Sequence, residues 1–261
     1  MKLTAASRRG ALTPALPVPY PALAQVGLRL RHGQVSLTVA APGVGKSMLW
    51  LNLAERTAVP TIFWSADTDS HDVLSRVTSL WSGHPAGEVE KNSGEPAWLQ
   101  WYAEKLEADR HIDWIFDPQL TAPLLAERIK AFAERHGDWP QLVVVDNLSN
   151  TVQSEAEERL DQQAFLKAAQ VLARQSGAHV ACLAHASAEY ETGEKPIPQA
   201  GVYNKLSKIP EVVITLHRAD QENKVLGLNV VKNRGGTSDP GARRALRFGI
   251  DFEKATVHGY R

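Results

Sequence analysis

Residues 40–47, AAPGVGKS, have the residue types and spacing of a phosphate-binding loop. Gly43 and Gly45 allow backbone N–H groups to turn toward phosphate oxygens, and the start of the following helix adds a positive dipole end. Lys46 is spaced to reach the β- and γ-phosphates, and Ser47 to ligate Mg²⁺. We therefore predict a site for ATP and Mg²⁺. The residues expected to contact the nucleotide are Ala41, Pro42, Gly43, Val44, Gly45, Lys46, Ser47 and Met48.

The loop departs from the usual pattern at its first position, where Ala40 replaces a glycine. An alanine is compatible with that position if its backbone φ is negative. The setting fits a phosphate loop, because a strand-like apolar run precedes it and a helix-like segment follows it.

Carboxylates follow two other strand-like runs. Asp146 ends the run LVVVD, at the sheet edge where the phosphate loop is expected, and is predicted to hold Mg²⁺ through water. The alternative is a turn or helix cap. Asp67, in FWSADTDS, is the first candidate for the carboxylate that orients or deprotonates the attacking water. Asp69 is the second candidate, and it could instead cap the next helix.

Three basic side chains complete the candidate chemistry. His185 ends an apolar run, where a polar residue can sense the γ-phosphate; a purely structural histidine is the alternative.

Lys232 and Arg234 lie two residues apart, so they project from the same side of an extended chain. They could be solvated charges, or a transition-state clamp of the arginine-finger type. So far along the chain, such a finger is more easily delivered to a neighbour's nucleotide, which predicts a ring or filament.

These residues must be positioned by apolar strands that alternate with helices. The pattern predicts an α/β fold, with a mostly parallel central sheet flanked by helices and a C-terminal antiparallel extension. Expected strands of the parallel part are 35–40, 60–65, 111–116, 142–146 and 179–185, and those of the antiparallel extension are 212–218, 225–234 and 245–250. Expected helices are 46–57, 69–82, 96–108, 121–136 and 157–176, with a loop at 83–94.

The helix expected at 96–108 carries Trp98, Trp101 and Tyr102. These rings could stack on bases, but core packing is the interpretation we favour.

Composition narrows the classes of function. The 261 residues include 29 basic and 29 acidic side chains, so any contact with nucleic acid requires a local patch. Cys182 is the single cysteine, which excludes an intrachain disulfide and fits a reducing compartment. No apolar run approaches the ~18–20 residues of a membrane span. We expect a cytoplasmic protein with no membrane partner.

Residues 1–26 are predicted to form a proline-rich arm, and 27–261 a single ATPase domain. The arm begins without acidic residues, as organelle transit peptides do, but its prolines argue against the amphipathic helix of such peptides. An arm extended on the chain's own body or on a neighbour is the favoured interpretation.

The ordered set AAPGVGKS, WSAD, DPQLT, VVVD, AH and KNRGG resembles the ATPase domain of hexameric replicative DNA helicases of the DnaB type, within the RecA-like P-loop NTPase fold. The resemblance covers roughly residues 27–250. It implies that Lys46 and Ser47 bind phosphate and Mg²⁺, and that Asp146 is the second metal residue. Lys232 and Arg234 match the pair that the family offers to the adjacent subunit.

The chain departs from the family at two candidate residues. Asp67 stands where the family usually has a catalytic glutamate and is one methylene shorter. His185 stands where the family often has glutamine. The family's N-terminal, primase-binding domain is missing, so we expect a stand-alone motor domain of plasmid or phage type, working in the host cytoplasm if viral. Expected partners are single-stranded DNA, a hexameric ring of this chain, and a primase or loader protein.

In RecA-like rings the loops after the fourth and fifth strands face the central channel. Here they correspond to residues 147–157 and 186–209, and the second is predicted to contact DNA backbone through its lysines. These lysines, accompanied by Tyr203, are Lys195, Lys205 and Lys208. An ordinary solvated loop is the alternative.

Three functions fit these features. The first is an ATP-hydrolysing DNA translocase or helicase. The second is a RecA-like recombinase, a strand-exchange filament that uses ATP as an assembly switch. The third is a regulatory ATPase that acts on a protein partner without DNA. A small-molecule phosphoryl-transfer enzyme is a weaker interpretation, since no acceptor pocket is evident.

Overall fold

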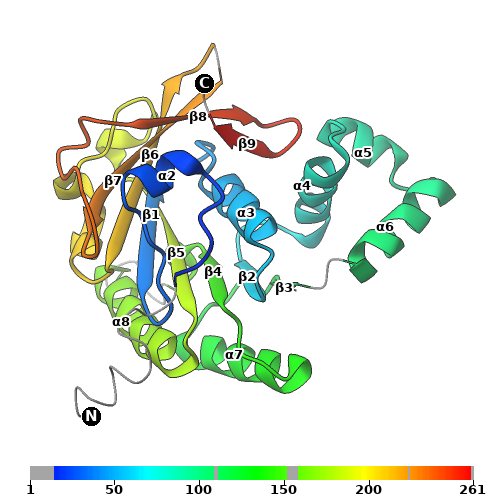
Figure 1. Cartoon of the computed structure of the whole chain (residues 1–261), viewed down its shortest axis with the longest axis horizontal. Helices are drawn as coiled ribbons and strands as arrows, with labels where there is room; N and C mark the ends of the chain where they lie inside the picture. The colour runs from blue at the N-terminus through cyan, green and yellow to red at the C-terminus, as the bar shows by residue number, and fades with distance from the viewer. Residues whose placement is uncertain (1–14, 109–110, 152–157, 223, 260–261) are drawn as a thin grey trace.

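The computed structural model describes residues 15–108, 111–151, 158–222 and 224–259 (Figure 1). Across these residues the strands form one nine-stranded sheet, in the order β3-β2-β4-β5-β1-β6-β7-β8-β9. No helix in the same ranges is long and apolar enough to cross a lipid bilayer. The predicted α/β fold with a mostly parallel sheet is confirmed.

Six neighbouring strands form the parallel part of the sheet. In spatial order they are β3 (Ile112–Ile115), β2 (Thr61–Ser65), β4 (Leu142–Asp146), β5 (His179–His185), β1 (Val35–Ala40) and β6 (Val212–Asp220). Every residue of β1, β2 and β4 is buried. Continuous apolar runs give this result because helices cover both faces of a parallel sheet.

The antiparallel extension consists of β7 (Val225–Asn233), β8 (Leu246–Asp251) and β9 (Thr256–Gly259). The sequence prediction was wrong in placing the 212–218 run in this extension, because β6 pairs in parallel with β1. The long connection after β5 lets the chain return to the other edge before β6 begins. The short turn from β6 to β7 can only reverse the strand direction. Strand β9 was not predicted.

Helices cover the two faces of the sheet in separate layers (Figure 1). On one face lie α2 (Pro21–Gln25), α3 (Lys46–Thr57) and α4 (Ser70–Ser82), whose buried residues share a core with β1 and β6. On the other lie α7 (Ala122–His136) and α8 (Glu158–Ser176). The side chain of Thr121 caps α7 by accepting a hydrogen bond from Leu124 N at 3.3 Å. The predicted helices at 46–57, 69–82, 121–136 and 157–176 are confirmed, whereas α2 lies in the predicted arm and was not predicted.

The prediction of a loop at 83–94 was wrong, because α5 (Ala86–Asn92) forms there. The turn-forming residues mark the ends of this helix, with Pro85 at its N-cap and Gly94 beyond its C-terminus. Val89 is buried and anchors the helix. The backbone N–H of Ala86 also donates to Glu253 O at 2.7 Å. A single apolar residue per two turns is too weak a periodic signal to identify so short a helix.

The aromatic residues of α6 (Pro96–Ala108) pack mainly on one another. Tyr102 is buried, as expected for core packing. Trp98 and Trp101 are half-buried, and with Trp81 of α4 they line a surface cavity of about 430 Å³. Core packing therefore describes Tyr102 but not the two tryptophans.

The described part of the arm, residues 15–26, packs on the body of the same chain. Tyr20 is buried, its ring lies 5.4 Å from that of Phe248, and its hydroxyl donates to Val257 O at 3.0 Å. Burial raises the pKa of Tyr20 to about 12. A proline at the first helical position is compatible with α2, since its missing N–H would have no partner there. The rest of the arm lies outside the described residues.

Candidate nucleotide site and cation pair

Four predicted site residues come together at the carboxyl edge of the parallel sheet. The register places Asp146 opposite Ser65, two residues before Asp67, and His185 opposite Ala40, at the start of the phosphate loop. Lys46 follows that loop as the first residue of α3. Parallel strands end at one edge of a sheet, so residues far apart in sequence meet there.

The phosphate loop depends on two glycines with positive φ. Gly43 has a φ of 69° and Gly45 a φ of 111°, which L side chains rarely adopt. A Cβ on Gly45 would also lie 2.6 Å from Ile250 Cδ1. Ala40 lies in β1 and is not among the described residues with positive φ, so the departure from the usual pattern is compatible with the loop.

Lys46 is buried between two carboxylates. Burial lowers its pKa, while the charges of Asp146 and Asp67 raise it. Asp146 is only 4% exposed, and burial raises its pKa against the opposing effects of Lys46 and a hydrogen bond from Ser47. A positive charge within this pocket stabilises the ionised carboxylate.

The neighbouring oxygens of Ser47 and Asp146 suit a Mg²⁺ ion, a hard cation that prefers oxygen ligands. The described residues contain no group of three or more His, Cys, Asp or Glu side chains that could hold a metal by themselves. This is the donor set expected where substrate phosphates and water supply the remaining ligands.

Asn147 links Asp67 to His185. Its side-chain amide donates to Asp67 Oδ2 and lies 3.1 Å from His185 Nε2. His185 Nε2 itself lies 3.9 Å from Asp67 Oδ2. Interaction with His185 lowers the pKa of Asp67, burial opposes this effect, and Asn150 and Lys46 add to the lowering. The sequence analysis missed Asn147, although its place directly after Asp146 is a usable signal.

Asp69 has a different role in the structure. It is the N-cap of α4, and its Oδ1 accepts a hydrogen bond from Asp72 N at 2.9 Å. Of the two alternatives considered for Asp69, the geometry fits the cap.

A cavity of about 270 Å³ lies beside the phosphate loop and was not predicted. It is lined by Val44, Arg218, Lys224 and Phe252, among others. Phe252 is 47% exposed, and Arg218 Nη2 lies 3.4 Å from where a Cβ on Gly43 would stand. The cavity offers a ring and a guanidinium to a flat ligand.

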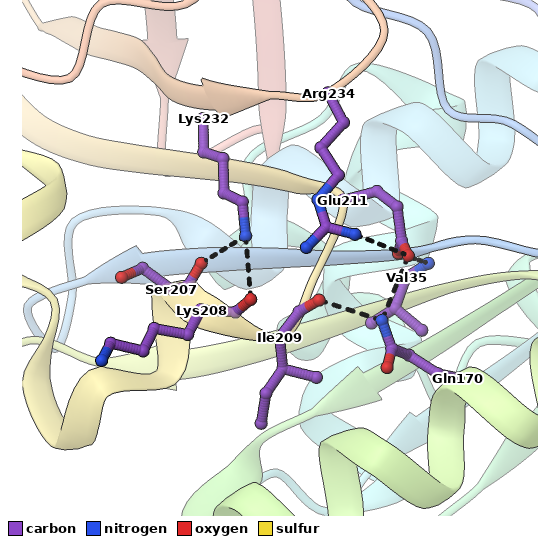
Figure 2. A network of polar contacts seen from close by, with 8 residues as sticks. All are labelled: Val35, Gln170, Ser207, Lys208, Ile209, Glu211, Lys232 and Arg234. Carbon is purple, nitrogen blue, oxygen red and sulfur yellow. Dashed lines mark hydrogen bonds and ion pairs between the residues drawn. The ribbon is translucent and has the colours of Figure 1, made fainter.

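Lys232 and Arg234 lie at the opposite, amino edge of the sheet. Asn233 pairs with Val212, which pairs with Ser36 near the start of β1. With a rise of about 3.3 Å per residue, β1 alone separates the two edges by about 17 Å. The structure therefore does not bring this cation pair to the chain's own Lys46. Lys232 Nζ instead donates to Ser207 O at 2.7 Å and Lys208 O at 3.1 Å (Figure 2).

The 186–209 segment is packed on the sheet instead of being a free loop. It contains the 3₁₀ turns η3 (Ala188–Tyr190), η4 (Gln199–Gly201) and η5 (Tyr203–Lys208). Its buried apolar residues, which contribute to the core, are Tyr190, Ile197, Val202 and Leu206. The predicted DNA contacts Lys195, Lys205 and Lys208 are exposed, as is Tyr203.

The 186–209 segment also contacts the phosphate loop. Gly193 packs so closely on Val44 of the loop that a Cβ at position 193 would lie 2.5 Å from Val44 Cγ2. Arg218 holds the neighbouring residue, since its Nη1 donates to Thr192 O at 2.8 Å. Of the other predicted channel loop, residues 148–151 form the 3₁₀ turn η1 (Leu148–Thr151), and 152–157 lie outside the described residues.

Comparison with known proteins identifies relatives over most of the chain. Residues 16–190 match the AAA domain family. The Gene 65 protein of Mycobacterium phage L5 is 33% identical over 238 residues, covering 89% of this chain and 88% of the relative. The Gene 65 protein of Mycobacterium phage D29 is 33% identical over 211 residues, covering 78% and 90%.

Solved structures resemble the fold at low sequence identity. A DnaB-like replicative helicase, studied with its interactions with primase, matches with a TM-score of 0.82 at 11% identity, over 99% of this chain and 66% of that one. A second structure, solved as an isolated ATPase domain, matches with a TM-score of 0.80 at 11% identity, over 99% and 96%. A KaiC-like protein from Pyrococcus horikoshii OT3 matches at 0.65 and 13% identity, over 96% and 100%. The resemblance drawn from the sequence is confirmed at the level of the fold.

Proposed function

The chain belongs to the AAA domain family and is a P-loop ATPase with the RecA-like fold of DnaB-type helicase domains, and from this premise we propose that it is an oligomeric motor that moves on single-stranded DNA. The observation that carries the proposal is the separation of two incomplete half-sites. A nucleotide site lies at one edge of the sheet, and a cation pair lies at the other.

At the carboxyl edge, the chain's own residues bind and orient ATP. Backbone N–H groups of the loop and the Lys46 ammonium hold the phosphates. Ser47 and Asp146 would hold Mg²⁺, whose charge would stabilise the negative charge that develops on the phosphoryl oxygens. Asp67 stays ionised at neutral pH, because His185 lowers its pKa, and it orients the attacking water. Asn147 fixes Asp67 relative to His185, which is proposed to sense the γ-phosphate.

The cavity beside the loop is proposed to hold the adenine base. Phe252 offers a stacking surface, and Arg218 lies next to Gly43. A ring and a guanidinium bind a planar base without discriminating strongly among bases.

Lys232 and Arg234 are proposed to complete the nucleotide site of an adjacent subunit. An arginine finger is effective only within contact of the transferred phosphoryl group, and the chain's own loop is at the opposite edge. Head-to-tail contacts of this kind form rings when the rotation closes. We propose a hexamer, by analogy with the DnaB-type helicases.

The exposed lysines Lys195, Lys205 and Lys208 are proposed to contact the DNA backbone in the channel of this ring. The relatives in mycobacteriophages support a phage protein that works in the host cytoplasm. A primase or loader is proposed as a further partner, because the DnaB-like helicase structure is described with its primase interactions.

The deciding experiment is steady-state ATP hydrolysis with and without single-stranded DNA, using Lys46→Ala as the blank. We expect DNA to stimulate the wild type and to leave the variant inactive. Hydrolysis that ignores DNA would instead support the regulatory ATPase. Stimulation accompanied by continuous filaments in electron micrographs, with no strand separation, would support the recombinase.

A further inference from the structure

Glu211 is a buried carboxylate at the meeting point of three elements (Figure 2). Its Oε2 accepts a hydrogen bond from Val35 N at 3.0 Å, and its Oε1 accepts one from Gln170 Nε2 at 3.1 Å. Arg234 Nη1 approaches the same Oε1 to 3.9 Å. Glu211 thus joins the start of β1, the middle of α8 and the end of β7.

The backbone N–H of Arg234 donates to Glu211 O at 3.0 Å, so the backbones of the two residues are joined. The contact between their side chains is the weakest of the three side-chain contacts of Glu211. Its distance exceeds that of a hydrogen bond, and the Arg234 side chain is 56% exposed. The Glu211 carboxylate accepts hydrogen bonds from Val35 N and Gln170 Nε2 whether or not the Arg234 side chain is beside it. Release of Arg234 therefore does not strand a buried, unpaired carboxylate, whose cost would otherwise prevent the release.

Lys232 closes the end of the 186–209 segment. It is bound to the carbonyls of Ser207 and Lys208, the last two residues of η5. These carbonyls are neutral acceptors, so a phosphate oxygen offers Lys232 a stronger partner. Burial lowers the pKa of Lys232, and the Arg234 charge lowers it further.

Two cations thus share one carboxylate at this edge. The surplus positive charge attracts an additional anion, and the two side chains rest on partners that a triphosphate can outcompete.

We propose that Glu211 and the carbonyls of Ser207 and Lys208 form a resting site that holds Arg234 and Lys232 until the neighbouring subunit binds ATP. This inference rests on the proposed function, in which the pair acts on the neighbour's nucleotide. When Lys232 moves to the phosphates, the end of the 186–209 segment is released. ATP bound by one subunit thereby changes the DNA-contacting segment of the next, and Glu211 is a positioning residue for the cation pair.

The first test needs no substitution in the resting site. Trypsin cuts after Lys205 and Lys208, whereas the Lys195–Pro196 bond resists it, so cleavage within the segment reports on its end. We expect a non-hydrolysable ATP analogue to increase cleavage after Lys208 several-fold in assembled protein without DNA. Lys232→Ala should be cleaved quickly with or without the analogue, and Lys130→Ala, at an exposed site on α7, should behave as wild type.

Mixed assemblies show whether the signal comes from the neighbour. Tagged Lys46→Ala subunits cannot bind their own nucleotide, so they should become cleavable only when mixed with wild-type subunits and the analogue. Cleavage that ignores the analogue, or that follows a subunit's own nucleotide, would overturn the proposal.

The second test measures competition. Glu211→Gln keeps an acceptor for Val35 N but removes the charge, so a fluorescent ATP analogue should bind the assembly about threefold more tightly. The gain should vanish when Arg234→Ala is present, and Glu134→Gln on α7 should give no gain. A gain that persists without Arg234, or no gain at all, would overturn the proposal; if Glu211→Gln does not fold, the proteolysis decides.

Different results would overturn the proposed function and the resting site. A chain that neither assembles nor responds to DNA would overturn the proposed function, and this inference with it. A second outcome would overturn this inference alone. DNA would stimulate ATP hydrolysis, and mixed rings of Arg234→Ala and Lys46→Ala subunits would regain activity. The ATP analogue, however, would leave trypsin cleavage after Lys208 unchanged.

Discussion

The two edges of the parallel sheet carry opposite arrangements of charge. At the carboxyl edge the buried ammonium of Lys46 lies between two carboxylates, Asp67 and Asp146. At the amino edge the buried carboxylate of Glu211 is shared by two cations, Lys232 and Arg234. One edge is suited to bind a metal–nucleotide complex, and the other to bind an anion.

Neither edge is a complete site by itself. The carboxyl edge has the groups that we propose position ATP and water, but the candidate finger residues are at the far side of the sheet. The amino edge has the cations but no phosphate loop. Two copies of the chain, placed edge to edge, supply both halves.

The largest expected effect on activity follows from removal of the Arg234 guanidinium at the amino edge. Arg234→Ala should reduce DNA-stimulated ATP hydrolysis by about 10³-fold, because an arginine finger contributes that much or more to phosphoryl transfer. Steady-state kinetics measure the loss. In mixtures, Arg234→Ala and Lys46→Ala proteins should partly restore activity, because a junction between them can combine an intact loop with an intact finger. No restoration at any ratio would show that each chain uses its own residues.

The amino edge also contains a histidine whose protonation opposes folding. His179 is fully buried, its Nδ1 faces Arg31 O at 2.9 Å, and Ser36 Oγ lies 2.9 Å from Nε2. Burial lowers its pKa to about 4, from 6.5. The unfolded chain binds this proton first, so stability is unaffected above pH 6.5 and falls as the pH decreases toward 4. The total loss is about 3 kcal/mol, at 1.36 kcal/mol per pKa unit.

Denaturant unfolding between pH 7 and pH 4 tests this linkage. His179→Gln should lower stability at pH 7 but remove most of the slope, whereas His258→Gln, at an exposed site, should keep it. An unchanged slope in His179→Gln would show that other groups govern acid sensitivity.

The carboxyl edge offers a sharper comparison between two neighbouring aspartates. Asp67→Asn should lower the rate of hydrolysis by about 100-fold, because a general base contributes 10²–10⁴-fold. Asp69→Asn should change it less than about twofold, since asparagine caps helices as well as aspartate does. Binding of a fluorescent ATP analogue should be similar in both variants. Equal losses of rate in the two would contradict the assignment of Asp67.

Sequence patterns predicted five of the six parallel strands, and β6 was the exception. Each of these five strands is a short apolar run, and the ends of parallel strands share an edge, so Asp67, Asp146 and His185 could be expected to meet near Lys46. The fold class followed from the same alternation of strands and helices.

The rest depended on contacts that no local pattern encodes. Arg218 lies near the end of β6 and Phe252 directly after β8, and both strands are placed by antiparallel pairing with β7. Periodicity in the sequence does not encode such pairing. Glu211 was not among the predicted residues, because its contacts are with Val35 and Gln170, far away in sequence. The packing of the 186–209 segment on the sheet was not predicted, because its four buried apolar residues are irregularly spaced.

A substitution in the cavity beside the phosphate loop has the smallest expected effect. It tests ATP binding separately from the chemical step at the carboxyl edge. Phe252→Ala should raise the KM for ATP about tenfold with little change in kcat, since stacking of a base on an aromatic ring contributes about 1–3 kcal/mol, and the ring holds ground and transition states equally. Inorganic tripolyphosphate, which has no base, should inhibit the wild type and Phe252→Ala equally. Phe116→Ala, at another exposed phenylalanine, should leave the KM unchanged. A lower kcat in Phe252→Ala, or weaker inhibition by tripolyphosphate, would mean that Phe252 supports the phosphate loop through Gly45, which its ring approaches. Substitutions at the two edges would then both lower kcat, so Phe252→Ala and Arg234→Ala would no longer separate nucleotide binding at one edge from catalysis by the other.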